Sequence, residues 1–182
     1  MPEEKDKKNQ SQTFTFDHDW KTVMKGFWNK YPDKKLDFVK WNKVIGFDVT
    51  EDGNIKFKRI IFIKKLYFIW AYGLEELTFD FKKRILDAKT SVLRKSMWVP
   101  YSADEFIQYK EFLNKDKFNT IYEKILDYKT GAVSNFLSKV NKSYVKGCMI
   151  VAGKCALIKE LEEKFRGEAT YDLMERLKDI GE

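Results

Sequence analysis

The chain has 182 residues, and its 35 lysines and arginines against 28 aspartates and glutamates give a formal charge of +7 at pH 7. This length favours a single domain, and the absence of any run of eighteen apolar residues argues against a membrane-spanning helix. Two cysteines and one histidine are too few for a metal site, and we expect no cofactor. The positive charge favours anionic partners such as phosphate groups or acidic membranes, although a solvated lysine-rich surface explains it equally well.

The first elements of the chain are a tail, a strand and a helix. Residues 1–11 carry charges of both signs and no apolar core, so we expect a disordered tail and neither a signal peptide nor a transit sequence. Alternation of threonine with phenylalanine predicts a strand over residues 12–16. Apolar residues at helical spacing from Trp20 onward predict a helix that Pro32 ends, with Asp17 as its cap.

A hairpin is predicted next, with strands at residues 37–49 and 55–63. The Asp-Gly-Asn turn at residues 52–54 favours it, since glycine and asparagine tolerate positive φ. Alternation in the second strand places Arg59 in the middle of an apolar row. Burying a guanidinium without a partner is costly, so we expect either an acidic side chain or an anionic ligand beside it.

Residues 66–74 contain four aromatic side chains and no charge. The stretch is too short to span a bilayer, and it fits either a core helix or an exposed lid that dips into a lipid surface beside Lys64 and Lys65. The residues expected in such a lid or membrane contact are Tyr67, Phe68, Ile69, Trp70 and Tyr72.

Four more strands and a long helix complete the domain. The strands are predicted at residues 74–81, 90–98, 105–113 and 118–128, and their hairpin-sized spacing indicates an antiparallel meander. The helix is predicted at residues 130–165, about 50 Å long. Its Cys148 and Cys155 are too far apart for a disulfide with each other, and we expect both to be buried.

The order of these elements indicates an α+β fold in which a curved antiparallel sheet of about seven strands grips the long C-terminal helix. We expect one domain at residues 12–166, with a lipid-sized cavity between the sheet and the helix. Residues 167–182 are expected to form a short helix or a tail.

Signals of catalysis are weak. The sequence has no nucleotide-binding glycine pattern, no GxSxG and no HExxH, and we do not expect an enzyme. His18 is expected to have a structural role, and Glu75 and Glu76 are expected on a solvated face. Nucleic-acid binding is also not expected, because the aromatic residues alternate toward the core instead of lining the lysine rows.

Signals of ligand binding come from basic residues near apolar faces. Lys154 lies close to the apolar side of the long helix, where it meets a ligand or extends its ammonium to the edge. Lys139, Lys142 and Lys146 form a row on the same helix, which attracts phosphate if it borders a cavity mouth and is otherwise a solvated face.

Two stretches resemble a known family. FDHDWKTVMKGFWNKYPD at residues 16–33, followed by DVTEDGNIKFKRII at residues 48–61, resembles the opening of the PRELI-like (slowmo) family. Lys30-Tyr31-Pro32-Asp33 matches the family's basic residue before Tyr-Pro-Asn, and Lys58-Arg59-Ile60-Ile61 matches its T-x-R strand. A later N-x-x-K-G signature is partly matched at residues 143–147, whereas Asp37-Phe38 replaces the Pro-His of many relatives.

The resemblance implies a carrier of single phospholipids, phosphatidic acid or phosphatidylserine, between the mitochondrial outer and inner membranes. It also implies a small helical Cys-rich partner in the intermembrane space, and a lid at residues 67–73. Lys30, Arg59 and Lys146 would contact the headgroup, with Lys142 as a weaker candidate. With Lys154 from the helical pattern, the candidate headgroup residues are Lys30, Arg59, Lys142, Lys146 and Lys154.

Two other functions fit the same expected fold. One is a grip-fold binding module for another apolar ligand, such as a sterol. The other is an enzyme such as a cyclase, which would need an ionisable pair inside the pocket.

Overall fold

The computed structural model describes residues 7–97, 103–129 and 134–164. Its elements are strand β1 (Lys7–Phe16), helix α1 (Trp20–Trp28), the 3-10 helix η1 (Lys34–Leu36), strands β2 (Val39–Val49), β3 (Ile55–Leu66), β4 (Ile69–Asp80), β5 (Ile85–Lys95), β6 (Ala103–Asn114) and β7 (Lys117–Lys129), and helix α2 (Ser134–Lys164). The strands form one seven-stranded antiparallel sheet with a long C-terminal helix, which confirms the predicted α+β class.

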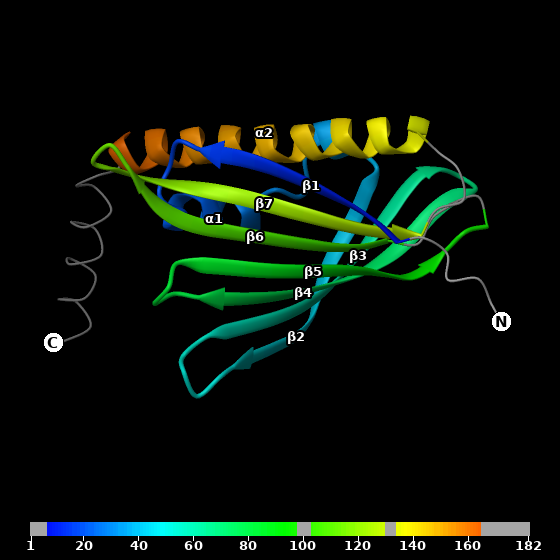
Figure 1. Ribbon diagram of the computed structural model, residues 1–182, viewed down its shortest axis with the longest axis horizontal. Coiled ribbons are helices and arrows are strands. Elements are labelled where there is room, and N and C mark those ends of the chain that lie inside the picture. The colour runs from blue at the N-terminus through cyan, green and yellow to red at the C-terminus, as the bar shows by residue number, and fades with distance from the viewer. Residues whose placement is uncertain (1–6, 98–102, 130–133, 165–182) are drawn as a thin grey trace, which may run out of the picture.

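The sheet has the order β1-β7-β6-β5-β4-β3-β2 (Figure 1). Strands β2 to β7 pair with their neighbours in sequence, as a meander does, and β1 joins the far side by pairing with β7. The chain therefore crosses from one edge of the sheet to the other between β1 and β2, and α1 and η1 make this crossing.

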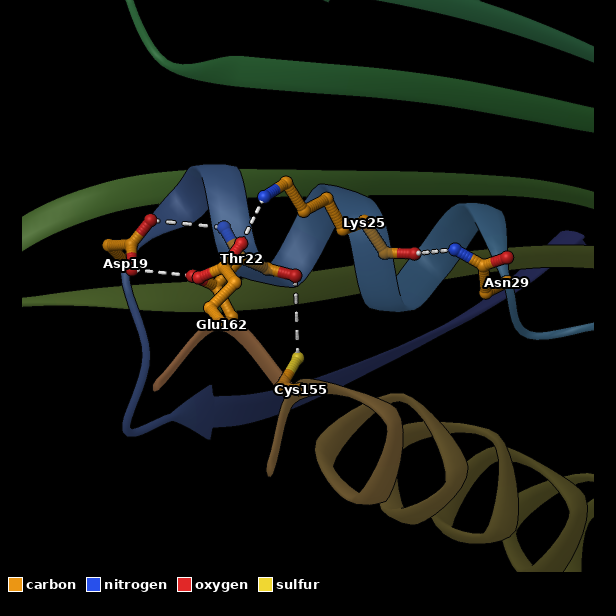
Figure 2. Close-up of polar contacts among 6 residues, drawn as sticks. All are labelled: Asp19, Thr22, Lys25, Asn29, Cys155 and Glu162. Carbon is orange, nitrogen blue, oxygen red and sulfur yellow. Dashed lines mark hydrogen bonds and ion pairs between the residues drawn. The ribbon is translucent and has the colours of Figure 1, made fainter. Parts of the chain in front are cut away.

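Helix α2 has 31 residues and runs lengthwise along the molecule, at the top of Figure 1, while β2 lies at the bottom. At about 1.5 Å per residue it is about 46 Å long, close to the predicted length. Its C-terminal half packs on α1, where Lys25 forms an ion pair with Glu162 (Figure 2).

Small residues allow α1 and α2 to approach closely. A Cβ on Gly26 would lie 2.8 Å from Cys155 Sγ and 3.0 Å from the Val151 carbonyl oxygen. The Cys155 thiol donates to the Thr22 carbonyl across a 3.6 Å contact (Figure 2). Cys148 and Cys155 are both free and buried, as predicted.

Asp19, and not Asp17, caps α1. Its carboxylate accepts from the Thr22 backbone N–H at 3.0 Å and from the Thr22 hydroxyl at 2.7 Å (Figure 2). Asp19 immediately precedes the first helical residue, so its side chain reaches the amide three positions on. Asp17 instead accepts from the Asn119 side-chain amide at 3.3 Å.

The core lies between the inner face of the sheet and the two helices. It is rich in aromatic residues and includes both cysteines. Its most deeply buried members are Phe16, Trp20, Val23, Phe27, Leu77, Leu86, Tyr109, Val151 and Cys155.

Strands β1, β4 and β5 each begin five residues earlier than predicted. Strand β1 starts at Lys7, so residues 7–11, expected in the tail, pair with β7. Gln10 and Gln12 share a side of this strand with Phe14 and Phe16, and these polar residues hide the alternation. Strand β5 starts at Ile85, five residues before the predicted start, because its inward Ala88 weakens the apolar pattern.

In strand β2, the alternation of apolar residues from Val39 to Val49 predicts that they share one face, and the structure contradicts this prediction. Its pairing with β3 shifts register between Val39 and Trp41 and again between Val44 and Gly46. Each extra residue reverses the alternation, so Trp41 and Phe47 lie on opposite faces of the sheet. Sequence alternation cannot reveal such bulges.

Candidate ligand-binding site

Arg59 lies on the inner face of the sheet, directly opposite Glu75 of β4. The two side chains are 2% and 4% exposed, and Arg59 Nε donates to a Glu75 carboxylate oxygen. Of the two partners expected for Arg59, the structure supplies the acidic side chain. The expectation that Glu75 lies on a solvated face is wrong, because Glu75 alternates inward with the buried Leu77.

The pairing leaves part of the Arg59 guanidinium without a partner. Its Nη2 atom is buried and has no hydrogen-bond acceptor among the described residues. Leaving a charged N–H unpaired in the interior costs free energy, so this atom marks a place where an acceptor from a ligand would be stabilising.

Lys30, one of the predicted headgroup residues, lies beside this pair. Its Nζ is 4.8 Å from the centre of the Tyr31 ring, and the Arg59 guanidinium carbon is 6.0 Å from the same ring. Burial acts to lower the pKa of Lys30, but its electrostatic interactions with Tyr31 and Glu75 outweigh burial, so the pKa is raised. Lys30 is therefore a half-buried cation at neutral pH.

A second buried ion pair, not predicted from the sequence, joins Lys124 of β7 to Glu105 of β6. Lys124 is only 7% exposed, and its Nζ lies 6.0 Å from the centre of the Tyr144 ring of α2. Lys124 alternates with Tyr122 and Leu126, so it carries the same signal as Arg59, a charge in the middle of an apolar row.

Tyr109 is close enough to the carboxylates of both ion pairs to interact with them electrostatically. Burial raises the pKa of Tyr109 well above its usual value, and the nearby Glu75 and Glu105 carboxylates raise it further. Burial likewise raises the pKa of the Cys148 thiol to about 11, while the charges of Lys30 and Lys124 act to lower it. The Cys148 thiol of α2 is thus close to the charges of both Lys30 and Lys124.

We call Lys30, Arg59, Glu75, Glu105 and Lys124 the interior cluster. Its three cations face two carboxylates, so it holds one positive charge in excess. An arrangement of this kind can bind an anionic group in an otherwise apolar interior.

The predicted headgroup lysines of the long helix do not join this cluster. Lys146 is exposed, and Lys154 lies 3.9 Å from Asp33, the residue that caps η1. Lys142 belongs to α2, but its side chain is outside those described. Among the predicted headgroup residues, the structure brings together Lys30 and Arg59.

The predicted lid is part of the sheet. Tyr67 and Phe68 form the two-residue turn between β3 and β4, and Ile69, Trp70 and Tyr72 belong to β4. The expectation of a core helix or a separate lid is wrong as secondary structure, because Ile69, Trp70 and Tyr72 pair with β3. The lipid-sized cavity remains a prediction.

The structure gives no sign of a metal site or a membrane span in the part of the chain that it describes. No group of three or more His, Cys, Asp or Glu side chains there fits a metal ion. No described helix is long and apolar enough to cross a membrane.

No protein-family model matches the sequence, and no curated protein matches it. Among solved structures, 236 chains match, and one of them is the crystal structure of Ara h 8.0201. That structure superposes with a TM-score of 0.60 and 8% identity over 83% of this chain and 99% of its own. A likeness at this identity shows the fold, which is an α+β helix-grip.

Proposed function

We propose that the protein binds and carries an amphipathic ligand with one anionic headgroup, a phospholipid such as phosphatidic acid or phosphatidylserine. The observation that supports this most is the interior cluster, with its excess positive charge and the unpaired Nη2 of Arg59. Phosphate oxygens accept charge-assisted hydrogen bonds, so one phosphate group would satisfy both features.

The surroundings of the cluster suit the rest of such a ligand. Buried apolar side chains flank the cluster on the same face of the sheet, namely Ile61, Leu77, Ile107 and Leu126. Acyl chains placed along them would gain about 0.8 kcal/mol per buried methylene. The interior cluster would hold the headgroup, and the apolar side chains beside it would contact the acyl chains.

The proposed role is that of a carrier and not of an enzyme. The resemblance of residues 16–33 and 48–61 to the PRELI-like family supports a finer proposal. In it, the protein shuttles phospholipid between mitochondrial membranes, in the intermembrane space, with a small helical Cys-rich partner.

A second candidate is a binding module for a neutral apolar ligand such as a sterol. The observation that favours it is the direct pairing of Arg59 with Glu75, which already neutralises most of the charge that a headgroup would use.

Native mass spectrometry of the protein purified from cells, followed by lipid identification, separates the two candidates. We expect one phosphatidic acid or phosphatidylserine per chain. Recovery of a neutral ligand would overturn the phospholipid proposal in favour of the second candidate.

Lys30→Gln is the sharper test of the site, because it removes a cation and leaves the Arg59–Glu75 pair in place. Replacing Arg59 itself would strand a buried carboxylate and so test folding instead. Since hydrogen bonds to charged groups contribute about 1.5–3 kcal/mol, we expect Lys30→Gln to lower extraction of phosphatidic acid from vesicles about tenfold or more.

Lys21→Gln is the matched control, because Lys21 is an exposed lysine of α1, the helix that ends two residues before Lys30. It removes the same charge and should leave extraction within about twofold of wild type, as surface substitutions usually do. Equal effects of the two substitutions would show that net charge, and not the interior cluster, governs extraction.

A further inference from the structure

The outer face of the sheet has an aromatic cluster of its own, formed by Trp41, Phe62, Trp70 and Tyr72. Phe62 stacks on Tyr72 with ring centres 4.7 Å apart. The Trp41 ring centre lies 5.6 Å from that of Phe62, and the Trp70 ring centre lies 5.7 Å from that of Tyr72. Phe62 is three residues from Arg59, so alternation along β3 puts it on the opposite face. We call these four residues the outer aromatic cluster.

The β3–β4 hairpin extends this cluster to a protruding tip. The tip consists of Leu66, Tyr67 and Phe68, and Tyr67 at its end is 88% exposed. Leu66 and Phe68 are about half exposed. Along the hairpin, the side chains change in polarity from the largely apolar tip to the amphipathic Trp70 and Tyr72 behind it.

Basic side chains surround the outer aromatic cluster. Lys43, Lys64 and Arg94 share its face, opposite Ile60, Trp70 and Tyr72 respectively. None of the three forms an ion pair with another described residue. Glu76, a carboxylate of the same face, is already paired with Lys58 at 2.8 Å.

We propose that the hairpin tip and the outer aromatic cluster dock the protein on the surface of an anionic bilayer. An apolar tip inserts below the headgroups, tryptophan and tyrosine lie at their level, and lysine and arginine meet lipid phosphates. The positive charge of this surface, and the change from apolar to amphipathic side chains away from the tip, both match the interface of an anionic bilayer.

The packing of the rings favours a bilayer over single-stranded nucleic acid. A stacking platform needs separate, accessible ring faces for successive bases. Here Phe62 and Tyr72 stack on each other, and the centre of the Trp41 ring lies 5.6 Å from that of Phe62 and 6.0 Å from that of Tyr72. The exposed Leu66 offers no stacking surface either.

Vesicle flotation with the full chain tests the proposal without any bound ligand. We expect binding to phosphatidylcholine vesicles that contain about 30% phosphatidylglycerol, and little binding to phosphatidylcholine alone. Because Tyr67→Ser with Phe68→Ser removes two aromatic side chains that would insert into the bilayer, this double variant should bind about tenfold more weakly or worse.

The matched control is Leu113→Ser with Phe118→Ser. These residues flank the β6–β7 turn and are 64% and 59% exposed, so the control removes similar apolar surface from another hairpin. It should bind vesicles within about twofold of wild type, as surface substitutions away from a contact usually do. Equal losses in both double variants would overturn the proposal.

A fluorescence measurement locates the contact. Cys148 and Cys155 are buried, so a dye attached to Tyr67→Cys labels the tip selectively. Its emission should shift to the blue when phosphatidylglycerol vesicles are added, and a dye at Leu113→Cys should not shift.

Two results would contradict docking on a bilayer. One is the absence of a shift at residue 67. The other is loss of binding to a single-stranded oligonucleotide, with unchanged vesicle binding, in the Tyr67 and Phe68 double variant, which would assign the surface to nucleic acid. The Lys30→Gln substitution lies on the other side of the sheet and should leave flotation unchanged, so failure of this proposal is separable from failure of the ligand proposal.

Discussion

At the scale of single residues, His18 shows how burial makes stability depend on pH. Its Nδ1 atom is buried and has no hydrogen-bond partner among the described residues. Burial lowers the pKa of His18 below its usual 6.5, and the Lys159 charge lowers it further, while Asp17 and Asp19 oppose the shift. The unfolded chain therefore binds the proton more readily than the folded protein.

We expect the contribution of neutral His18 to the free energy of unfolding to be fully present above pH 6.5, the pKa of a free histidine. This contribution should be lost as the pH falls below that value. Denaturant unfolding of wild type and His18→Gln between about pH 7.5 and 5.5 measures this effect. The variant should lose less stability than wild type over that range. Equal slopes for the two proteins would show that His18 has the same pKa folded and unfolded.

The ionisable residues of the site were predictable to different degrees. Arg59 was found because a charge interrupts an apolar alternation, and Lys124 carries the same signal between Tyr122 and Leu126. Glu75 was not found, because which carboxylate meets Arg59 depends on the pairing of β3 with β4. Alternation assigns a residue to a face, whereas only strand register assigns it a partner.

At the scale of elements, the contact between α1 and α2 depends on Gly26. A methyl group there would overlap Cys155 Sγ and approach the Val151 carbonyl oxygen, a backbone atom that cannot turn away. A methyl group on Gly153, within α2, meets nothing within 4 Å. Comparing alanine substitutions at the two positions therefore distinguishes the effect of packing from that of helix propensity.

Gly26→Ala should destabilise the protein by about 1–3 kcal/mol, since overpacking outweighs the gain in helix propensity. Gly153→Ala should stabilise it by up to about 1 kcal/mol for propensity alone. Urea unfolding of both variants measures these changes. A stabilised Gly26→Ala protein would mean that α2 moves to accept the methyl group.

The existence of the elements followed from the sequence better than their ends did. The strands β6 and β7 and the helix α2 have long, regular apolar patterns, and their predicted ranges hold within a few residues. The early start of β1 and the bulges of β2 did not follow, because glutamines share the side of Phe14 and Phe16 in β1 and extra residues reverse the faces of β2.

At the scale of the whole molecule, the interior cluster and the outer aromatic cluster occupy opposite faces of one sheet and share no residue. Changes at sites without shared partners usually add. Binding of a ligand inside and docking outside should therefore be separable properties of the same chain.

We expect Lys30→Gln to leave vesicle flotation unchanged, and Tyr67→Ser with Phe68→Ser to leave ligand stabilisation unchanged. Thermal unfolding with and without phosphatidic acid measures the second quantity, because a ligand that binds the folded state raises the melting temperature. In the combined variant, the rate of lipid transfer should fall by the product of the factors measured for the two single changes. A combined loss no larger than the greater single loss would indicate one shared site.

The overall architecture was predictable because six consecutive strands in a meander leave few ways to cover one face with a long helix. The outer aromatic cluster was not. The sequence predicted a lid or membrane contact for Trp70 and Tyr72, but not their packing with Trp41 and Phe62, because the bulges of β2 turn Trp41 outward onto Phe62.

The Arg59–Glu75 pair also bears on how β3 and β4 find each other during folding. Sliding one strand by two residues keeps every apolar row on its own face, so hydrophobic alternation alone barely distinguishes the result from the native pairing. Such a slide would place Arg59 opposite Leu77 or Gly73 and leave two buried charges apart. Because isolated buried charges are far costlier than paired ones, this single contact selects the native alignment from its closest competitors.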